Sequence, residues 1–303
     1  MSEITVTLVN WYSQEYIAEL ACNLQDKASG KYSLRYLIID NTNRQDQTLY
    51  DWADRPANLE IVPFSVGQAK GSIAHARALD RAMEALATPY SLIIDPDIYV
   101  FKQDWDAFCV NLLDRNEAVA VGAPYPVWKT GKYHDFPSPP FCFFRTEALQ
   151  SLSSDWYPYA RGRVEHSAKF AARIIGRLGL VITRRAYERF RWARRYSRMA
   201  EGMLGVFSPD TGWFLADEAR RKGLKTIQFD AVLPGSSALP HLADTEPWQT
   251  LAGHYELFTH EDEPILTHKY GSAGWHWKTV LGPDKATWKR CIEQVETTLK
   301  AGT

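Results

Sequence analysis

Two acidic residues, Asp95 and Asp97, stand on either side of Pro96 directly after the apolar run 91–94. Side chains two apart in an extended strand point to opposite faces, but a proline ends the strand and lets both carboxylates turn toward one point. Two hard oxygen donors at one point suit a divalent cation that carries a diphosphate. Such acidic triplets are also common in turns and solvated loops, so the elements around the pair have to decide between the two interpretations.

Alternating strands and helices surround the acidic pair. Apolar runs of strand length occur at 4–9, 34–39, 59–64 and 91–94. Apolar residues at helical spacing occupy 13–27, with Ser13 as a candidate N-cap, and 71–87. This order predicts an α/β protein with a largely parallel, doubly wound sheet. Open sheets of this kind bind ligands beyond the carboxyl ends of their strands, which is where Asp95 and Asp97 lie.

Four segments resemble the family 2 glycosyltransferases and their relatives, which are nucleotide-sugar-dependent enzymes of the GT-A fold. The segments are Val9-Asn10-Trp11-Tyr12-Ser13, Ile39-Asp40-Asn41-Thr42, Ala76-Arg77 and Asp95-Pro96-Asp97. This resemblance covers about the first 100 residues. Farther along, 140–145 resembles the strand beneath the acceptor, 208–213 the acidic acceptor-side motif, and 218–223 the basic end of the helix that follows it.

The resemblance implies one GT-A domain with a doubly wound, Rossmann-like mixed sheet at 1–235. Its nucleotide-sugar-binding half would be 1–100, and a basic helical insert would occupy 155–205. Residues 236–303 would form a helical C-terminal extension that completes the active site.

The resemblance also implies a donor site. Its nucleotide-sugar-binding residues would be Asn10, Trp11, Tyr12, Asp40, Arg77 and Asp95. Asp95 and Asp97 would hold a metal ion, Asp40 would read the nucleobase, and Arg77 would contact the diphosphate. By residue type alone, Asp40-Asn41-Thr42 is also explained as an Asx-type strand exit, and Arg77 as an ordinary exposed helix residue.

Asp210 is the candidate catalytic base in the acceptor-side motif. An inverting transfer needs a base that takes the proton of the acceptor hydroxyl from the side opposite the leaving group. The family often has an adjacent Glu-Asp pair where this chain has Asp210 alone. Trp213 beside it can stack on the acceptor sugar. The structural alternatives are an N-cap of the helix expected at 213–222 for Asp210, and a core position for Trp213.

The chain has eight histidines, and His268 is the one we single out. It follows a short apolar strand and enters a loop with Gly271, where many GT-A enzymes supply a third metal ligand. An imidazole beside carboxylates favours manganese over magnesium as the cofactor. Lys269 would meet the diphosphate if this loop closes over the donor. His241 is the weaker candidate for the same ligand position.

The overall composition bounds the location of the protein. With 303 residues the chain can bury a large core. Its four cysteines have no C-x-x-C spacing, which predicts free thiols in a reducing compartment. There is no secretory signal pattern, and no apolar run approaches the roughly 18 residues of a membrane span. We therefore expect a cytoplasmic protein, either free or peripheral at the inner face of the membrane.

A strongly basic segment lies between Ala160 and Glu201. It holds twelve Lys and Arg against three acids, and the rest of the chain has 23 basic and 33 acidic residues, a net charge of −10. One predicted helix carries a basic stripe beside an apolar one: Lys169, Arg173 and Arg177 next to Phe170, Ile174 and Leu178. A second is predicted over 184–199. The segment is explained by a solvated helical hairpin, by docking on anionic lipid or a lipid-diphosphate acceptor, or by nucleic-acid binding.

Together these features predict a metal-dependent transferase that moves a hexosyl or related group from a nucleotide-diphosphate donor to an acceptor hydroxyl, with inversion. The expected acceptor is a bacterial surface glycan or a lipid-linked glycan. The alternatives are a glycosyltransferase acting on modified nucleic acid and a non-catalytic sugar- or nucleotide-binding protein of GT-A type. A nucleotidyltransferase would carry a glycine-rich loop after the first strand, where this chain has Asn10-Trp11-Tyr12-Ser13.

Overall fold

A seven-stranded mixed sheet forms the centre of the protein. The computed structural model describes residues 2–159, 162–177, 182, 184–233, 246–269 and 285–301. The strand order is β3-β2-β1-β4-β7-β6-β8. The strands are β1 (Glu3–Asn10), β2 (Ser33–Asp40), β3 (Leu59–Pro63), β4 (Tyr90–Ile94), β6 (Ala120–Pro124), β7 (Pro137–Arg145) and β8 (Thr226–Gln228).

The first four strands are parallel to one another, and β7 runs antiparallel between β4 and β6. This arrangement confirms the predicted α/β class with a doubly wound mixed sheet. The strands expected at 4–9, 34–39, 59–64 and 91–94 are all present within one residue at each end.

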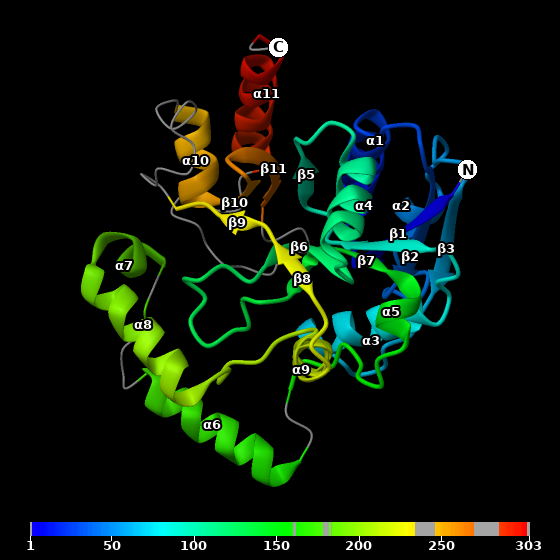
Figure 1. The fold of residues 1–303 in the computed structure, drawn as a ribbon. Helices are drawn as coiled ribbons and strands as arrows, with labels where there is room; N and C mark the ends of the chain where they lie inside the picture. The colour runs from blue at the N-terminus through cyan, green and yellow to red at the C-terminus, as the bar shows by residue number, and fades with distance from the viewer. Residues whose placement is uncertain are drawn as a thin grey trace.

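Helices cover both faces of the sheet (Figure 1). On one face lie α1 (Gln14–Asp26) and α4 (Trp105–Asn116), and on the other lie α3 (Gly71–Met83), α5 (Thr146–Gln150) and α9 (Trp213–Arg221). The short α2 (Gln47–Tyr50) follows β2. The helix expected over 71–87 ends at Met83.

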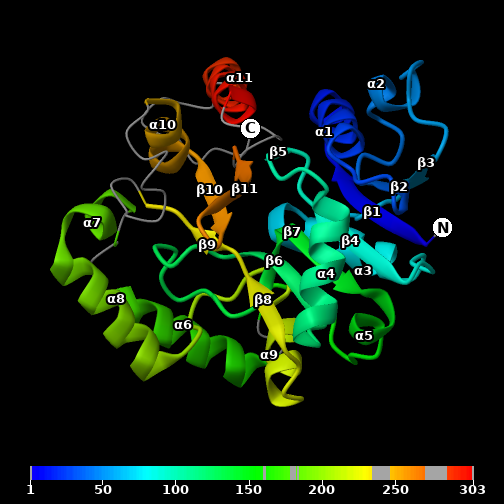
Figure 2. The same ribbon diagram turned by 45° about the horizontal axis from the view of Figure 1, so that its top comes forward.

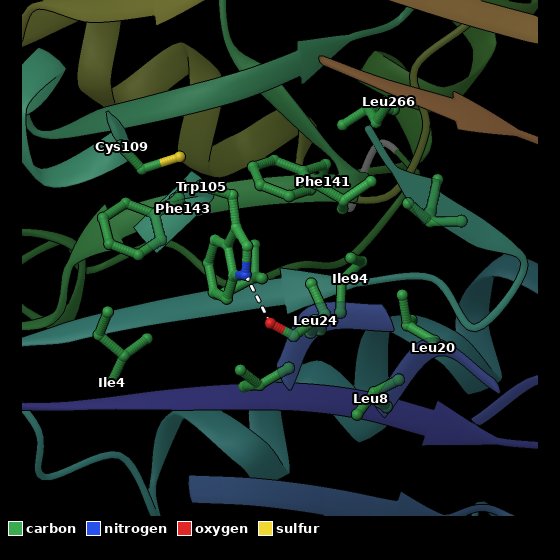
Figure 3. Close-up of a cluster of buried hydrophobic side chains, with 14 of the residues drawn as sticks. Ile4, Leu8, Leu20, Leu24, Ile94, Trp105, Cys109, Phe141, Phe143 and Leu266 are labelled. Carbon is green, nitrogen blue, oxygen red and sulfur yellow. Dashed lines mark hydrogen bonds between the residues drawn. The ribbon is translucent and has the colours of Figure 1, made fainter. Parts of the chain in front are cut away.

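Alternation of side chains along the strands builds the two cores. In β1, Ile4, Val6 and Leu8 all point into the cluster beneath α1 and α4. Figure 3 shows this cluster, in which the Trp105 indole donates a 2.9 Å hydrogen bond to the carbonyl of Leu24. The bond ties α4 to α1 on the same face of the sheet and satisfies the one polar group of a fully buried tryptophan.

A second, four-stranded sheet adjoins the first. Its order is β5 (Ile98–Val100), β11 (Glu263–His268), β10 (Glu256–His260) and β9 (Asp230–Ala231). A separate core, which includes Phe101, Trp248 and Trp288, packs α10 (Glu246–His254) and α11 (Lys285–Ala301) against it. Since β5 begins one residue after Asp97, the two sheets meet at the Asp95-Pro96-Asp97 triplet.

The basic segment contains three helices, namely α6 (Arg163–Arg177), α7 (Arg184–Arg189) and α8 (Arg191–Leu204). The single helix expected over 184–199 is therefore wrong, because Phe190 has an extended backbone and separates α7 from α8. The break lets Arg184 donate to the carbonyls of Ala252 and Tyr255, while α8 turns its small residues toward the protein. Leu178, expected in the apolar stripe, lies outside the described residues.

Among the described helices, none combines the length and apolar character needed to cross a bilayer. All four cysteines are free thiols, as expected, and three of them are buried.

Candidate active site

Asp95, Asp97 and His268 converge where the two sheets meet. The Nε2 atom of His268 lies 3.3 Å from Oδ1 of Asp97 and 3.8 Å from Oδ2 of Asp95. One candidate ligand atom from each residue lies within 4.8 Å of the others. Asp97 and His268 are buried, and Asp95 is partly exposed. Two carboxylates and an imidazole at these separations form a donor set that can hold a divalent cation.

Strand pairing brings His268 to the acidic pair. β11 runs antiparallel to β5, with His268 opposite Ile98, the residue after Asp97. The backbone N–H of Lys269 donates to the carbonyl of Asp97 at 2.9 Å and closes this junction. About 170 residues of sequence separation are thus bridged by backbone hydrogen bonds, which fix the imidazole relative to both acids.

Glu256 stands directly behind His268 in the neighbouring strand. The two residues are cross-strand partners in the β10–β11 hairpin, and Oε2 of Glu256 lies 2.9 Å from Nδ1 of His268. Oε1 of Glu256 is paired with Nζ of Lys129 at 2.6 Å. When Nδ1–H donates to Glu256, Nε2 is the nitrogen that faces the acids. A carboxylate in this position is a common feature of metal-ligating histidines, so the residues present fit a bound metal ion.

The buried charges of this cluster shift one another. Burial lowers the pKa of His268, but the carboxylates of Asp97 and Glu256 outweigh it and raise that pKa to about 10. Burial raises the pKa of Glu256, but Lys129 and His268 bring it down to about 2. Desolvation raises the pKa of Asp95 in spite of the nearby imidazoles of His75 and His268. In the protein without a bound cation, His268 is therefore protonated at neutral pH, and its positive charge compensates the carboxylates of Asp97 and Glu256.

The first turn of α3 connects the cluster to Asp210. Nε2 of His75 lies 3.7 Å from Oδ1 of Asp95. Three residues earlier in the helix, the side chain of Ser72 hydrogen-bonds to Asp210, and the carbonyl of Ser72 accepts from the Thr211 hydroxyl at 3.5 Å. Ser72 and His75 are neighbours on the helix because they are three residues apart. Asp210 and Asp95, which they contact, therefore both lie next to the start of α3.

Asp210 is held by a partly buried lysine. Its Oδ2 lies 2.5 Å from Nζ of Lys132, and its Oδ1 accepts the backbone N–H of Thr211 at 2.9 Å. Burial raises the pKa of Asp210, but Lys132 and these hydrogen bonds hold it below its usual value. The N-cap of α9 is Gly212, not Asp210. A Cβ at position 212 would lie 2.7 Å from the Tyr133 hydroxyl, which explains the glycine.

Trp213 is a core residue with 8% of its surface exposed. Nζ of Lys169 lies 5.1 Å from its ring centroid, and the Arg220 guanidinium lies 5.7 Å away. Two cations thus lie close to the indole, three residues along the chain from Asp210. Stacking of this ring on an acceptor sugar stays a prediction.

Asp40 accepts five hydrogen bonds at the end of β2. Oδ1 accepts from the Asn10 amide and from the backbone and hydroxyl of Thr42, and Oδ2 accepts from the Arg44 N–H and the Tyr50 hydroxyl. These bonds outweigh burial and lower the pKa of the carboxyl. This is the strand-exit geometry that the sequence also allowed. Contact of Asp40 with a nucleobase stays a prediction.

The other predicted donor-site residues lie in different settings. Trp11 and Tyr12 expose their rings beyond β1, with the centroids 5.5 Å apart in an edge contact. Lys269 is buried, with Nζ 5.5 Å from the ring centroid of Tyr16. Arg77 lies two residues beyond His75, nearly on the opposite side of α3, and donates to the Val66 carbonyl at 3.1 Å. His241 lies outside the described residues.

The sequence analysis missed four residues that surround the predicted ones: His75, Lys129, Lys132 and Glu256. Glu256 carried only part of a signal, because a hairpin that turns at Glu261-Asp262 would by itself pair residue 256 with residue 267. A β-bulge between Phe258 and Thr259, which no sequence pattern marks, shifts the register and puts Glu256 opposite His268. Both turn residues have positive φ, as such two-residue hairpin turns require. The two lysines carried no such signal, since they lie in the loop between β6 and β7.

Three comparisons with known proteins were made. The sequence matches no protein-family model and no curated protein. The structure is similar to the mannosyltransferase PcManGT from Pyrobaculum calidifontis in complex with GDP-Man and Mn2+, with 15% identity and a TM-score of 0.40 over 82% of this chain and 83% of that chain. It is also similar to S. aureus TarS 1-349 in complex with UDP-GlcNAc, with 12% identity and a TM-score of 0.35 over 76% of this chain and 94% of that one. At these values neither likeness assigns an activity to this chain.

Proposed function

We propose that this protein is a metal-dependent, inverting glycosyltransferase of the GT-A type, similar to family 2. It would transfer a hexosyl or related group from a nucleotide-diphosphate donor to the hydroxyl of a bacterial surface or lipid-linked glycan. The observation that carries the proposal is the convergence of Asp95, Asp97 and His268, with Glu256 behind the imidazole. A cluster that merely stabilised the sheet junction would have no need of two carboxylates facing one histidine.

The metal site would consist of Asp95, Asp97 and Nε2 of His268, and manganese suits this mixture of oxygen and nitrogen donors. A divalent cation bound there supplies Lewis-acid compensation for the charge that develops on a departing diphosphate. Glu256 orients the imidazole, and Lys129 keeps Glu256 ionised and in place. The backbone junction between Lys269 and Asp97 holds this set of side chains together before any donor binds.

The donor would lie across the carboxyl ends of β1 and β4. Trp11 and Tyr12 offer two exposed rings that can wall a nucleobase, and Asn10 anchors their turn by accepting the backbone N–H of Ser13. Asp40 supports the same turn through its bond with Asn10. Arg77 and Lys269 would meet the diphosphate only after their side chains leave Val66 and Tyr16, respectively.

Asp210 is the proposed general base, and its pairing with Lys132 sets a condition on that role. An acceptor hydroxyl has to take the place of Lys132 at Oδ2 before it can give up its proton. Loss of the adjacent cation raises the basicity of the carboxylate, so displacement of Lys132 and activation of Asp210 occur together. Trp213 would form the floor of the acceptor side.

Calorimetric titration with a panel of nucleotide sugars, in manganese and again in chelator, tests the proposal. We expect one donor to bind only in manganese and to be hydrolysed slowly without acceptor. Equal affinity with and without metal would contradict the metal-dependent reading. Metal-dependent binding with no hydrolysis or transfer, even with glycan acceptors present, would instead favour the non-catalytic binding protein.

A further inference from the structure

The outward side of α6 is apolar and exposed. Val164 is 84% exposed and Phe170 61%, and both Ile174 and Ile175 are more than half exposed. In a helix these four positions fall on the half that faces away from Lys169, the residue through which α6 contacts the body. Burial of apolar side chains ordinarily drives helix packing, so a helix that turns them outward needs something to cover them.

The cationic side of α6 is the inner one. Lys169 donates to the carbonyl of Val206 at 2.6 Å and lies over the Trp213 ring. The sequence analysis left open that the stripe of Lys169, Arg173 and Arg177 docks on anionic lipid. In the structure the partly buried Lys169 points its ammonium toward Val206 and Trp213, so this residue is not turned outward. Arg173 is the exposed cation that α6 itself offers, and further positive charge comes from the elements beside it.

α8 supplies that charge. Trp192, Met199 and Met203 are each at least half exposed and recur after seven and four residues, so they share one side of the helix. Arg191, Arg195 and Arg198 are exposed on the adjoining strip. The inner side of α8 packs on the protein through the small residues Ala193, Ser197 and Ala200. This amphipathic arrangement puts an apolar strip beside a cationic one, both facing outward.

The two helices lie together along one edge of the molecule. α6 contacts α8, and Figures 1 and 2 show both of them at the side remote from β1, β2 and β3. Five exposed arginines of α7 and α8 have no ion-pair partner among the described residues: Arg185, Arg189, Arg191, Arg195 and Arg198. The edge thus combines uncovered apolar side chains with uncompensated positive charge.

We propose that the exposed side of α6 and α8 binds the surface of a bilayer that contains anionic lipid. The apolar side chains would enter the boundary between headgroups and acyl chains, and the arginines would remain among the phosphates. A second copy of the chain fits less well, because symmetric pairing would bring the two arginine strips together. Nucleic acid can meet the arginines but leaves Val164, Ile174 and Ile175 in water. This inference does not depend on the proposed activity.

Sedimentation of the full chain with vesicles tests the proposal. The vesicles are phosphatidylcholine alone or phosphatidylcholine mixed with phosphatidylglycerol, at low and at high salt. We expect binding to the anionic vesicles only, weakened by salt. Joint replacement Arg191→Glu, Arg195→Glu and Arg198→Glu should weaken partitioning at least about a hundredfold, since each cation near an anionic surface strengthens binding about fivefold.

A second variant, Phe170→Ser with Ile174→Ser, removes apolar area without changing any charge and should also weaken binding strongly. The matched control, Lys31→Glu with Arg55→Glu and Arg115→Glu, reverses three exposed cations on other elements and should bind as the wild type does. Circular dichroism checks that each variant is folded. No binding to anionic vesicles, equal binding to neutral ones, salt-sensitive binding of nucleic acid in place of lipid, or a dimer that the Phe170/Ile174 variant dissociates would each overturn the proposal.

Discussion

Two parallel strands of this protein end in acidic residues at the same edge of the sheet, and the structure uses them differently. At the end of β2, the two carboxylate oxygens of Asp40 accept five hydrogen bonds from its own turn and from neighbouring residues. At the end of β4, the groups around Asp95 and Asp97 include two imidazoles, one of them held from behind by Glu256. One carboxylate orders a loop, and the other two belong to the candidate metal site.

The difference shows that the position of an acid at a strand end does not decide its role. The hydrogen-bonding partners of the carboxylate decide its role. Backbone N–H and hydroxyl groups occupy its oxygens in the folded protein, whereas an imidazole nitrogen can itself become a metal ligand. Asp210 lies between the case of Asp40 and that of Asp95 and Asp97, since its main partner is the side chain of Lys132, which can move. The following predictions test this ranking, beginning with the largest expected effect.

Asp97→Ala should lower turnover at least about a thousandfold, because the diphosphate loses the charge compensation that a bound cation supplies. Donor affinity in manganese should fall to the value measured in chelator. Calorimetry with nucleotide sugar and initial-rate assays measure the two effects. The control Asp54→Ala removes an exposed acid from another loop and should change neither. If the Asp97 variant kept the full metal-dependent affinity for the donor, Asp97 would not be a ligand of the metal ion.

Asp210→Asn should lower turnover about a hundredfold, which is typical of a lost general base, with donor affinity nearly unchanged. The amide keeps the shape of the carboxylate and can still accept the Thr211 N–H. Rates with saturating donor and acceptor separate this effect from binding. Asp217→Asn on the same α9 should stay within about twofold of wild type. Near-normal turnover in the Asp210 variant would reduce Asp210 to an ion-pair partner of Lys132.

Most of the fold and the three candidate metal ligands could be predicted from the sequence. Apolar runs and helical periodicity are local signals, so β1 to β4, α1 and α3 were placed correctly. Lys129, Lys132 and Glu256 act through partners that only tertiary packing brings near, and no local pattern marks such pairs. The sequence also could not show that Lys169 points inward, because an amphipathic helix can turn either its apolar or its polar side outward when another surface covers the apolar side.

Glu256→Gln should weaken manganese binding about tenfold, with a smaller loss than His268→Ala, which removes a ligand outright. The amide can still accept from Nδ1 of His268, but the negative charge that strengthens the imidazole as a ligand is gone. Titration of manganese by electron paramagnetic resonance measures affinity without relying on activity. Glu263→Gln on the same hairpin is exposed and serves as the control. An unaltered manganese affinity would mean that Glu256 only fixes the β10–β11 hairpin.

Asp40→Asn separates the two roles open to that residue and should have the smallest effect on the site. If Asp40 only orders the strand exit, the variant loses about 2 kcal/mol of unfolding free energy near neutral pH, as expected for hydrogen bonds to a charged group, and the folded variant keeps donor affinity within about threefold. We expect this result because both oxygens are already occupied. A loss of donor affinity greater than about tenfold in a folded variant would show that Asp40 reads the nucleobase.

The pH dependence of the same variant provides a further check. The folded pKa of Asp40 is lowered from its usual 3.8, so the unfolded chain binds the proton more tightly. The stabilisation is therefore fully present above pH 3.8 and is lost as the pH falls through the lower folded value. Denaturant unfolding of wild type and Asp40→Asn should show a difference that is constant near neutral pH and shrinks below about pH 4. A difference that persists unchanged at lower pH would mean that the ionised carboxylate is not what its five donors stabilise.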